Sequence, residues 1–402
     1  MIILDKMKYF LVTLIAFFFS VSLFSQTRKL STTAEVSVIT CGPGSEFYTA
    51  FGHSAFRIRD TRIGLDKVYN YGTFDFDAPN FYGKFVKGNL MYFLSAYDFG
   101  HFLKVYNYEN RWVTGQVLDL NPKQVQKVFN FLEKNARPEN REYRYDYFYD
   151  NCSTRLYDVI YNVIGKENLE IPIVFSEDNL SHRQMMQEYF DNQPWGDFGI
   201  DLALGSPFDK SAAENEYLFL PENVMRFFNQ LKIIENKIPK PIVKRTEIIL
   251  PNNNHIHKTN FLNPFLVFSI IGVVVLWITK RNMNTKKRSR WLDFLLFFIT
   301  GLIGCIISFM WFATDHTATA KNFNTLWAFA PNIIISFFML KKNPPKWVYS
   351  YTNLLLILIV INVFIWILKI QIFSISVIPI LIFLTVRYYY IGKYNRLLTS
   401  KK

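Results

Sequence analysis

Cysteine and histidine are scarce in this chain, whose 402 residues include three cysteines and six histidines. Only Cys41 and Cys152 precede residue 260, and neither has a second Cys or His within a few residues. Zinc sites usually draw paired ligands from such short spacings. The scarcity therefore argues against a clustered metal site, and we expect neither a metal nor another cofactor.

Acidic residues are outnumbered, with 32 Asp and Glu against 45 Lys and Arg and a net charge of +13. Such an excess can indicate a nucleic-acid partner. Fourteen of the basic residues, however, flank long apolar runs on one side, as the positive-inside rule requires of cytoplasmic loops: Lys280, Arg281, Lys286, Lys287, Arg288, Arg290, Lys341, Lys342, Lys346, Arg387, Lys393, Arg396, Lys401 and Lys402. Topology thus accounts for the excess, and we expect no nucleic-acid partner.

The apolar runs predict delivery to a membrane. Lys6 and Lys8 precede the first run and small residues follow it, which is typical of an export signal over residues 1–25, with an uncleaved anchor as the alternative. Five later runs predict membrane spans, the third and fifth of them short: Phe261–Thr279, Trp291–Phe312, Leu326–Leu340, Val348–Leu368 and Ile372–Val386. The basic flanks place the C-terminus in the cytoplasm and the N-terminal part outside.

Composition divides the rest of the chain. Residues 26–236 are aromatic-rich with mixed charge and predict one exported domain. Residues 237–260 contain Pro239, Pro241 and Pro251 and predict a linker. A transmembrane domain over 261–390 and a cytoplasmic tail over 391–402 complete the predicted organisation.

The motif Asn151-Cys152-Ser153-Thr154-Arg155 opens a run whose apolar residues recur at helical spacing. A cysteine at a helix N-terminus gains thiolate character from the helix dipole. Cys152 is therefore a candidate nucleophile. An inert buried cysteine, or a disulfide with Cys41, is the alternative and is the commoner role of a cysteine in such a domain.

His53 is the candidate base. Ala55 to Arg59 alternates apolar and charged residues, which predicts a strand beginning beside the histidine. Cysteine on a helix and histidine on a strand is the papain-type arrangement, and the histidine-first order is that of permuted papain-like enzymes. Asn70, on the next predicted strand, is the candidate to orient the imidazole if the two strands form a hairpin, unless it only closes a turn.

Other residues complete the predicted site and fold. Tyr149 and Asn151 are candidates to line the site. Asp315 and His316, between the second and third spans, form either an exposed interfacial loop or a binding site for a lipid head group. Further predicted elements are strands at Val36–Thr40, Lys67–Gly72 and Trp112–Leu118 and a helix at Pro122–Ala136. These elements predict an α+β domain.

Several motifs together resemble the Bacteroidota lipoprotein N-acyltransferase family called Lnb: Gly42-Pro43-Gly44, Phe51 to Ala55, Asn151 to Arg155, Phe198 to Asp201 and the Asp315-His316 loop. The resemblance extends over the export signal, the exported domain and the membrane half. It implies a permuted papain-like, NlpC/P60-type periplasmic domain followed by an all-α domain of five transmembrane helices, located in the bacterial inner membrane.

The resemblance also implies an activity. The cysteine matching Cys152 would accept an acyl chain from a membrane phospholipid, with His53 acting as base and then acid. The acceptor would be the α-amino group of the lipidated N-terminal cysteine of an apolipoprotein. Two alternatives remain open at this point: a membrane-tethered cell-wall peptidase or amidase of the same Cys-His class, and a non-enzymatic receptor or scaffold with a Cys41–Cys152 disulfide.

Overall fold

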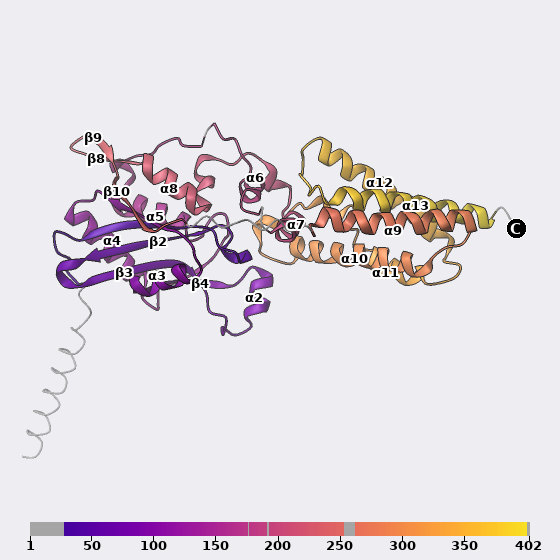
Figure 1. The fold of residues 1–402 in the computed structure, drawn as a ribbon, viewed down its shortest axis with the longest axis horizontal. Helices are drawn as coiled ribbons and strands as arrows, with labels where there is room; N and C mark the ends of the chain where they lie inside the picture. Colours follow the sequence, from indigo (N-terminus) through magenta and orange to yellow (C-terminus); the bar gives the residue numbers. More distant parts are fainter. Residues whose placement is uncertain (1–27, 176, 191–192, 253–261, 400–402) are drawn as a thin grey trace, which may run out of the picture.

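The computed structural model describes residues 28–175, 177–190, 193–252 and 262–399. Figure 1 shows a mixed α/β domain followed by a bundle of helices that extends away from it. The predicted export signal lies outside the described residues.

The N-terminal domain is built around an antiparallel sheet in the order β10-β5-β1-β2-β3-β4-β6. Its strands are β1 (Glu35–Cys41), β2 (His53–Asp60), β3 (Leu65–Thr73), β4 (Met91–Asp98), β5 (Val113–Leu118), β6 (Glu142–Arg144) and β10 (Val243–Leu250). The predicted strands around Val36, Val68 and Val113 are confirmed, and β2 and β3 form the predicted hairpin.

Helices cover both faces of this sheet. The N-terminal domain contains α2 (Phe81–Lys87), α3 (Phe99–Tyr108), α4 (Pro122–Asn135), α5 (Thr154–Ile164), α6 (His182–Gln187), α7 (Pro194–Ala203) and α8 (Pro221–Gln230). Residues Val36 and Val38 of β1 pack with α4, α5 and α8, whereas Ile39 and Cys41 pack with α3 on the opposite face. The period-two alternation of a strand thus supplies two separate apolar layers.

Helix α4 confirms the helix predicted after Asn121. The Asn121 side chain accepts hydrogen bonds from the backbone N–H groups of Lys123 and Gln124, and the Gln124 side chain accepts from the N–H of Asn121. Pro122 fits the first helical position because its missing N–H would have no helical partner there. This reciprocal cap fixes where the helix begins.

The linker predicted over residues 237–260 is wrong for its first half. Residues Ile238–Pro241 form β9, which pairs with β8 (Lys232–Glu235) in a small sheet completed by β7 (Leu169–Glu170). β10 then joins the edge of the large sheet beside β5. The prolines misled the prediction because β9 is an edge strand, where a missing N–H removes no ladder bond.

The C-terminal region is helical at all five predicted positions. Its helices are α9 (Pro264–Thr285), α10 (Arg290–Phe312), α11 (Asn332–Met339), α12 (Lys346–Ile367) and α13 (Val377–Thr399). Within the described residues, α9, α10 and α12 are long and apolar enough to cross a membrane. The count of five spans stays a prediction, since α11 has eight residues. Helix α13 continues to Thr399, so the residues of the predicted tail are helical as far as Thr399, and their cytoplasmic position stays a prediction.

A buried polar joint connects the two parts of the chain. The Asn322 side chain donates to the carbonyls of Leu202 and Ala203 at 2.7 and 3.0 Å. The backbone N–H of Gly205 donates to the carbonyl of Ala318 at 2.8 Å. A Cβ atom on Gly205 would lie 1.7 Å from the Ala320 carbonyl oxygen, so only glycine permits this approach. The joint holds the loop after α10 against the N-terminal domain.

Candidate active site

Cys152 precedes Ser153, the N-cap of α5, and is buried, with 8% of its surface exposed. The neighbouring Asn151 side chain accepts hydrogen bonds from the N–H groups of Ser153 and Thr154 at 2.8 and 2.9 Å. The same side chain donates to the carbonyls of Tyr147 and Phe219 at 2.9 and 2.8 Å. These contacts occupy the Asn151 amide, which favours a role in positioning Cys152 over the predicted contact with substrate.

His53 is the first residue of β2 and is half-buried. Its Nε2 lies 2.5 Å from Oδ1 of Asn70 on β3, and Asn70 Nδ2 donates to the Tyr97 hydroxyl at 3.3 Å. Nε2 therefore donates to the amide oxygen, which leaves Nδ1 as the ring nitrogen available to the thiol. The β2–β3 hairpin brings together the two residues that the sequence singled out.

Charge and hydrogen bonding pair His53 with Cys152. Burial raises the pKa of Cys152, but the charge of His53, a hydrogen bond with that ring, the Ser54 N–H and the Ser153 hydroxyl together lower it to about 7. Burial lowers the pKa of His53, yet the charge and hydrogen bond of Cys152, aided by Asn70, raise it overall. Both shifts favour a thiolate beside an imidazolium, which is the reactive form of a cysteine nucleophile.

Cys41 and Cys152 are both free thiols. Cys41 stands directly opposite His53 in the β1–β2 register, is fully buried, and packs on the α3 side of the sheet. Burial raises the pKa of the Cys41 thiol well above its ordinary value. Cys41 therefore has the character of a small buried hydrophobe, and the two thiols differ in reactivity because of their surroundings.

A bulge in β3 makes room for Cys152 at the end of the sheet. The register between β3 and β4 shifts between Asn70 and Thr73. Gly72, within this shift, has φ of +86°, and a Cβ atom there would lie 3.5 Å from Cβ of Cys152 and 3.4 Å from the Tyr145 ring. Glycine adopts this backbone conformation without strain. Tyr145 and Cys152 thus flank the same glycine.

A cavity of about 570 Å³ lies between the N-terminal domain and the loop that follows α10. Its lining residues are Phe85, Gly88, Leu90, Tyr92, Arg144, Tyr145, Asp146, Tyr147, Phe148, Asp315, His316, Thr317 and Ala318. The volume is in the range of small-molecule sites, and the wall combines five Phe and Tyr side chains with convergent polar and charged groups. Cys152 and His53 are not among the lining residues, and the connection runs through Tyr145, which lines the cavity and also approaches Gly72 beside Cys152.

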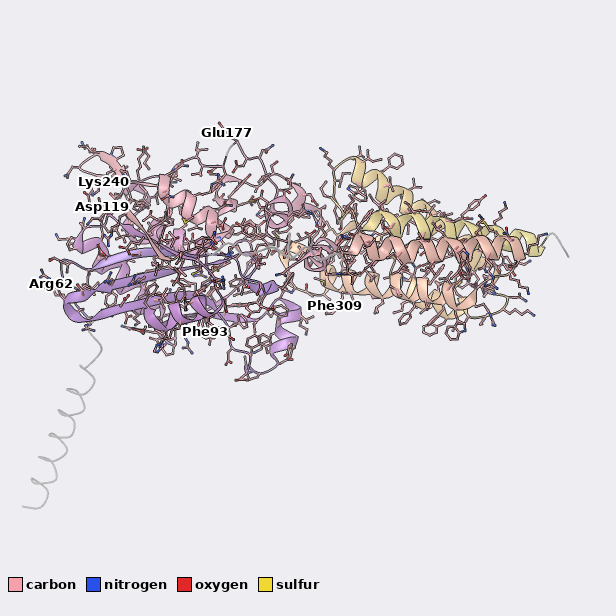
Figure 2. The ribbon with its side chains drawn as sticks, in the orientation of Figure 1. Arg62, Phe93, Asp119, Glu177, Lys240 and Phe309 are labelled. Carbon is pink, nitrogen blue, oxygen red and sulfur yellow. The ribbon has the colours of Figure 1, made fainter. Side chains whose placement is uncertain are left out.

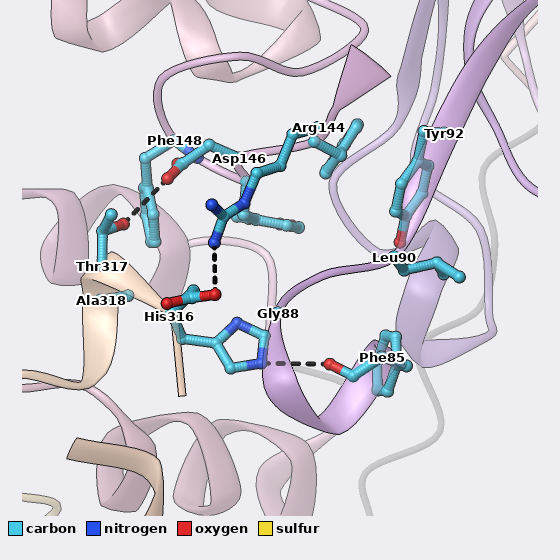
Figure 3. A pocket seen from close by; sticks show the side chains of 13 residues that line it. Phe85, Gly88, Leu90, Tyr92, Arg144, Asp146, Phe148, His316, Thr317 and Ala318 are labelled. Atoms are coloured by element: carbon cyan, nitrogen blue, oxygen red, sulfur yellow. Dashed lines mark hydrogen bonds and ion pairs between the residues drawn. The ribbon is translucent and has the colours of Figure 1, made fainter. Parts of the chain in front are cut away.

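The loop after α10 forms one wall of this cavity (Figure 3). Asp315 forms an ion pair with Arg144 at 2.9 Å, and Thr317 donates to Asp146 at 2.9 Å. His316 Nε2 donates to the Phe85 carbonyl at 3.2 Å. Both loop residues singled out by the sequence therefore contact the N-terminal domain. Their predicted role in binding a lipid head group stays a prediction.

Family models match two stretches of the chain. The Lnb N-terminal periplasmic domain matches residues 24–180, and the Lnb transmembrane domain matches residues 256–399. The chain belongs to the Lnb family. The first match includes His53, Asn70 and Cys152, and the second includes Asp315 and His316. No significant match was found among curated proteins or among solved structures.

Membership in Lnb indicates a membrane protein with a periplasmic N-terminal domain and an enzyme of lipoprotein processing. Within the part of this Lnb chain that the structure describes, no group of three His, Cys, Asp or Glu side chains is arranged to hold a metal ion. Tyr149 is half exposed, contacts the His182 ring and does not line the cavity.

Sequence reasoning missed part of the Lnb cavity wall. Arg144 and Asp146 bond to Asp315 and Thr317 of the loop after α10. Tyr145 approaches Gly72, which lies beside Cys152. A signal for these residues exists in the sequence, since aromatic and charged side chains alternate from Glu142 to Tyr147 just before the cysteine. Such alternation predicts a strand with one polar face.

Proposed function

We propose that this Lnb protein is a lipoprotein N-acyltransferase that carries the acyl chain as a thioester on Cys152. The observation that carries the proposal is the pairing of Cys152 with His53, whose ring contacts Asn70, near a cavity that has one wall from the loop after α10. A thiol with a pKa of about 7 is available as thiolate at neutral pH.

In the first step, the Cys152 thiolate attacks the ester carbonyl of a membrane phospholipid. A carbon–sulfur bond forms, the carbon–oxygen bond to the glycerol breaks, and the His53 imidazolium gives its proton to the departing oxygen. The products are an acyl-enzyme and a lysophospholipid. The backbone N–H of Cys152 at the start of α5 is the proposed donor to the oxyanion.

In the second step, the α-amino group of an apolipoprotein's lipidated N-terminal cysteine attacks the thioester. A carbon–nitrogen bond forms, the carbon–sulfur bond breaks, and His53 takes the proton from the amine, which restores the thiolate–imidazolium pair. Asn70 holds the ring in one orientation through both steps. The aromatic wall of the cavity favours amine over water by excluding solvent.

The membrane region places the reaction at its substrate. A phospholipid donor stays in the bilayer, so a site fixed at the membrane surface gains in effective concentration and orientation. The proposed topology has five spans, the N-terminal domain in the periplasm and the C-terminus in the cytoplasm, as the basic flanks predict. Contacts of Asp315 and His316 with the cavity wall support a direct role for the membrane region.

The alternatives are less well supported by the site. A cell-wall peptidase of the same class has no need of a cavity wall supplied by the membrane region, although peptidoglycan cleavage by the purified protein would favour that function. A scaffold with a Cys41–Cys152 disulfide does not fit two free thiols.

Mass spectrometry of lipoprotein N-termini tests the proposal. Cells that depend on this protein are expected to carry N-acylated lipoproteins when they express the wild type, and free α-amines when they express Cys152→Ala at equal levels. Cys305→Ala, which removes a free thiol on α10, is the matched control and should retain acylation. Full N-acylation by Cys152→Ala would refute the proposal.

A further inference from the structure

A short segment of the N-terminal domain presents an apolar surface that the core does not use. Phe76, Tyr82, Phe85 and Val86 are 69%, 78%, 52% and 50% exposed. The last three share one face of α2, because they are separated by three and four residues. Phe81 is buried and fixes the helix to the domain. Exposed apolar patches of this kind indicate a binding surface.

The same helix is attached to the membrane region. The N–H of Asp315 donates to the Lys87 carbonyl at 2.9 Å, and His316 bonds to the Phe85 carbonyl. Gly88, at the end of α2, has φ of +72°, and a Cβ atom there would lie 3.1 Å from the backbone nitrogen of His316. Glycine fits this position because L side chains rarely adopt this φ and an added Cβ would crowd the loop after α10.

This attachment sets the height of α2 relative to the bilayer. Helix α10 is one of the candidate membrane spans, and its last residue, Phe312, is exposed. Asp315 follows three residues later. A segment bonded to the residues that leave the bilayer lies at the membrane surface. Figure 1 agrees, since α2 lies at the end of the N-terminal domain that faces the helical region.

We propose that α2 and Phe76 insert into the outer surface of the membrane and form the entrance through which a phospholipid passes sideways into the cavity. Tyr82 and Val86 contact the acyl region, and Lys84 and Lys87 of the same helix bind head-group phosphates. Phe85 connects the exposed face of α2 with the cavity, because it is half exposed on the helix and also lines the cavity. The entrance role rests on the proposed function, whereas the membrane contact does not.

Photo-crosslinking tests the membrane contact directly. The full-length protein, with benzoylphenylalanine in place of Tyr82, is reconstituted in vesicles of phosphatidylethanolamine and phosphatidylglycerol and irradiated. Ile238 of β9 is the matched control, because it is 67% exposed and apolar but lies on the element at the far end of the domain. Figure 2 marks that end by Lys240 and Asp119, away from Phe309 of α10.

A phospholipid adduct at position 82 and none at position 238 is the expected result, read as a mass increase on the labelled peptide. An equal yield at the two positions, or none at position 82, would overturn the proposal. An adduct at position 82 in a protein that transfers no acyl chain would support the membrane contact while refuting the acyltransferase function, so the two failures are distinguishable.

A kinetic comparison tests the entrance. The double variant Tyr82→Ser and Val86→Ser should transfer acyl chains from vesicle phospholipid about tenfold more slowly, the scale expected for partial burial of two apolar side chains. Its alkylation rate at Cys152 should equal that of the wild type, since neither residue contacts the thiol. An unchanged rate from vesicles would contradict an entrance at α2.

Discussion

Replacement of His53 by alanine probes the electrostatic pairing that activates Cys152. In the wild type the thiol has a pKa of about 7, so about half of it is thiolate at pH 7. The charge of His53 and its hydrogen bond are the main influences that lower this pKa against burial. Without the ring, burial remains and these two influences are lost.

The size of the effect follows from the ordinary pKa of cysteine. If the pKa of Cys152 in His53→Ala returns to about 8.5, the thiolate fraction at pH 7 falls to about 3%. The reaction rate with an alkylating agent then falls by roughly 15-fold, and the thiolate loses about 2 kcal/mol of stabilisation. Burial makes these figures lower bounds, because it raises the pKa further.

The assay is the rate of iodoacetamide labelling at Cys152 between pH 5 and 10, followed by mass spectrometry of the peptide that contains it. The wild-type rate should rise through a midpoint near pH 7 and that of His53→Ala through a midpoint above about pH 8.5. Cys152→Ala supplies the background from the other thiols. Overlapping profiles for the wild type and His53→Ala would refute the pairing.

Further predictions concern the surroundings of the pair. Acyl transfer should rise with pH through about 7, as Cys152 loses its proton, and a flat profile between pH 6 and 8 would count against a thiolate. Asn70→Ala should reduce transfer by less than His53→Ala, because the ring remains but loses its partner; an equal loss would make Asn70 more than an orienting residue. Asp315→Ala removes an exposed ion pair worth less than about 1 kcal/mol, so stability and alkylation should persist while transfer falls; unchanged transfer would remove the loop from the site. Gly205→Ala should lower the melting temperature through its clash with Ala320, whereas Gly199→Ala, whose added Cβ meets no atom within 4 Å, should not; equal melting temperatures would contradict the tight joint. A chimera with one unrelated span in place of the helical region should lose transfer with its thiol still reactive, and full activity would show that the region only anchors the enzyme.

The elements around the candidate pair were predictable because their signals are local. The alternation after His53, the polar helix start at Cys152 and the cap at Asn121 each depend on neighbouring residues, and each element appears in the structure. Asn70 was identified through one further assumption, that two consecutive strands form a hairpin, which the β2–β3 pairing confirms. The permuted papain-like assignment stays a prediction.

The cavity wall and the role of Asn151 depend on contacts between segments that are distant in the chain, and a single sequence does not show such contacts. The cavity brings together residues near Phe85, near Arg144 and near Asp315. Asn151 was expected to meet substrate because its polarity is visible in the sequence, whereas its buried bonds to Tyr147 and Phe219 are not. Strand β9 was missed because prolines break interior strands but not edge strands.

Capture of the acyl-enzyme tests the central claim most directly. The purified full-length protein is mixed with phospholipid vesicles in the absence of an acceptor. The mass of the peptide that contains Cys152 is then measured by mass spectrometry before and after treatment with neutral hydroxylamine. We predict one acyl chain on Cys152, removed by hydroxylamine and by addition of a lipoprotein bearing a free α-amine. Acyl transfer to that lipoprotein by the Cys152→Ala variant, or an acyl chain on another residue of a competent wild type, would contradict the account.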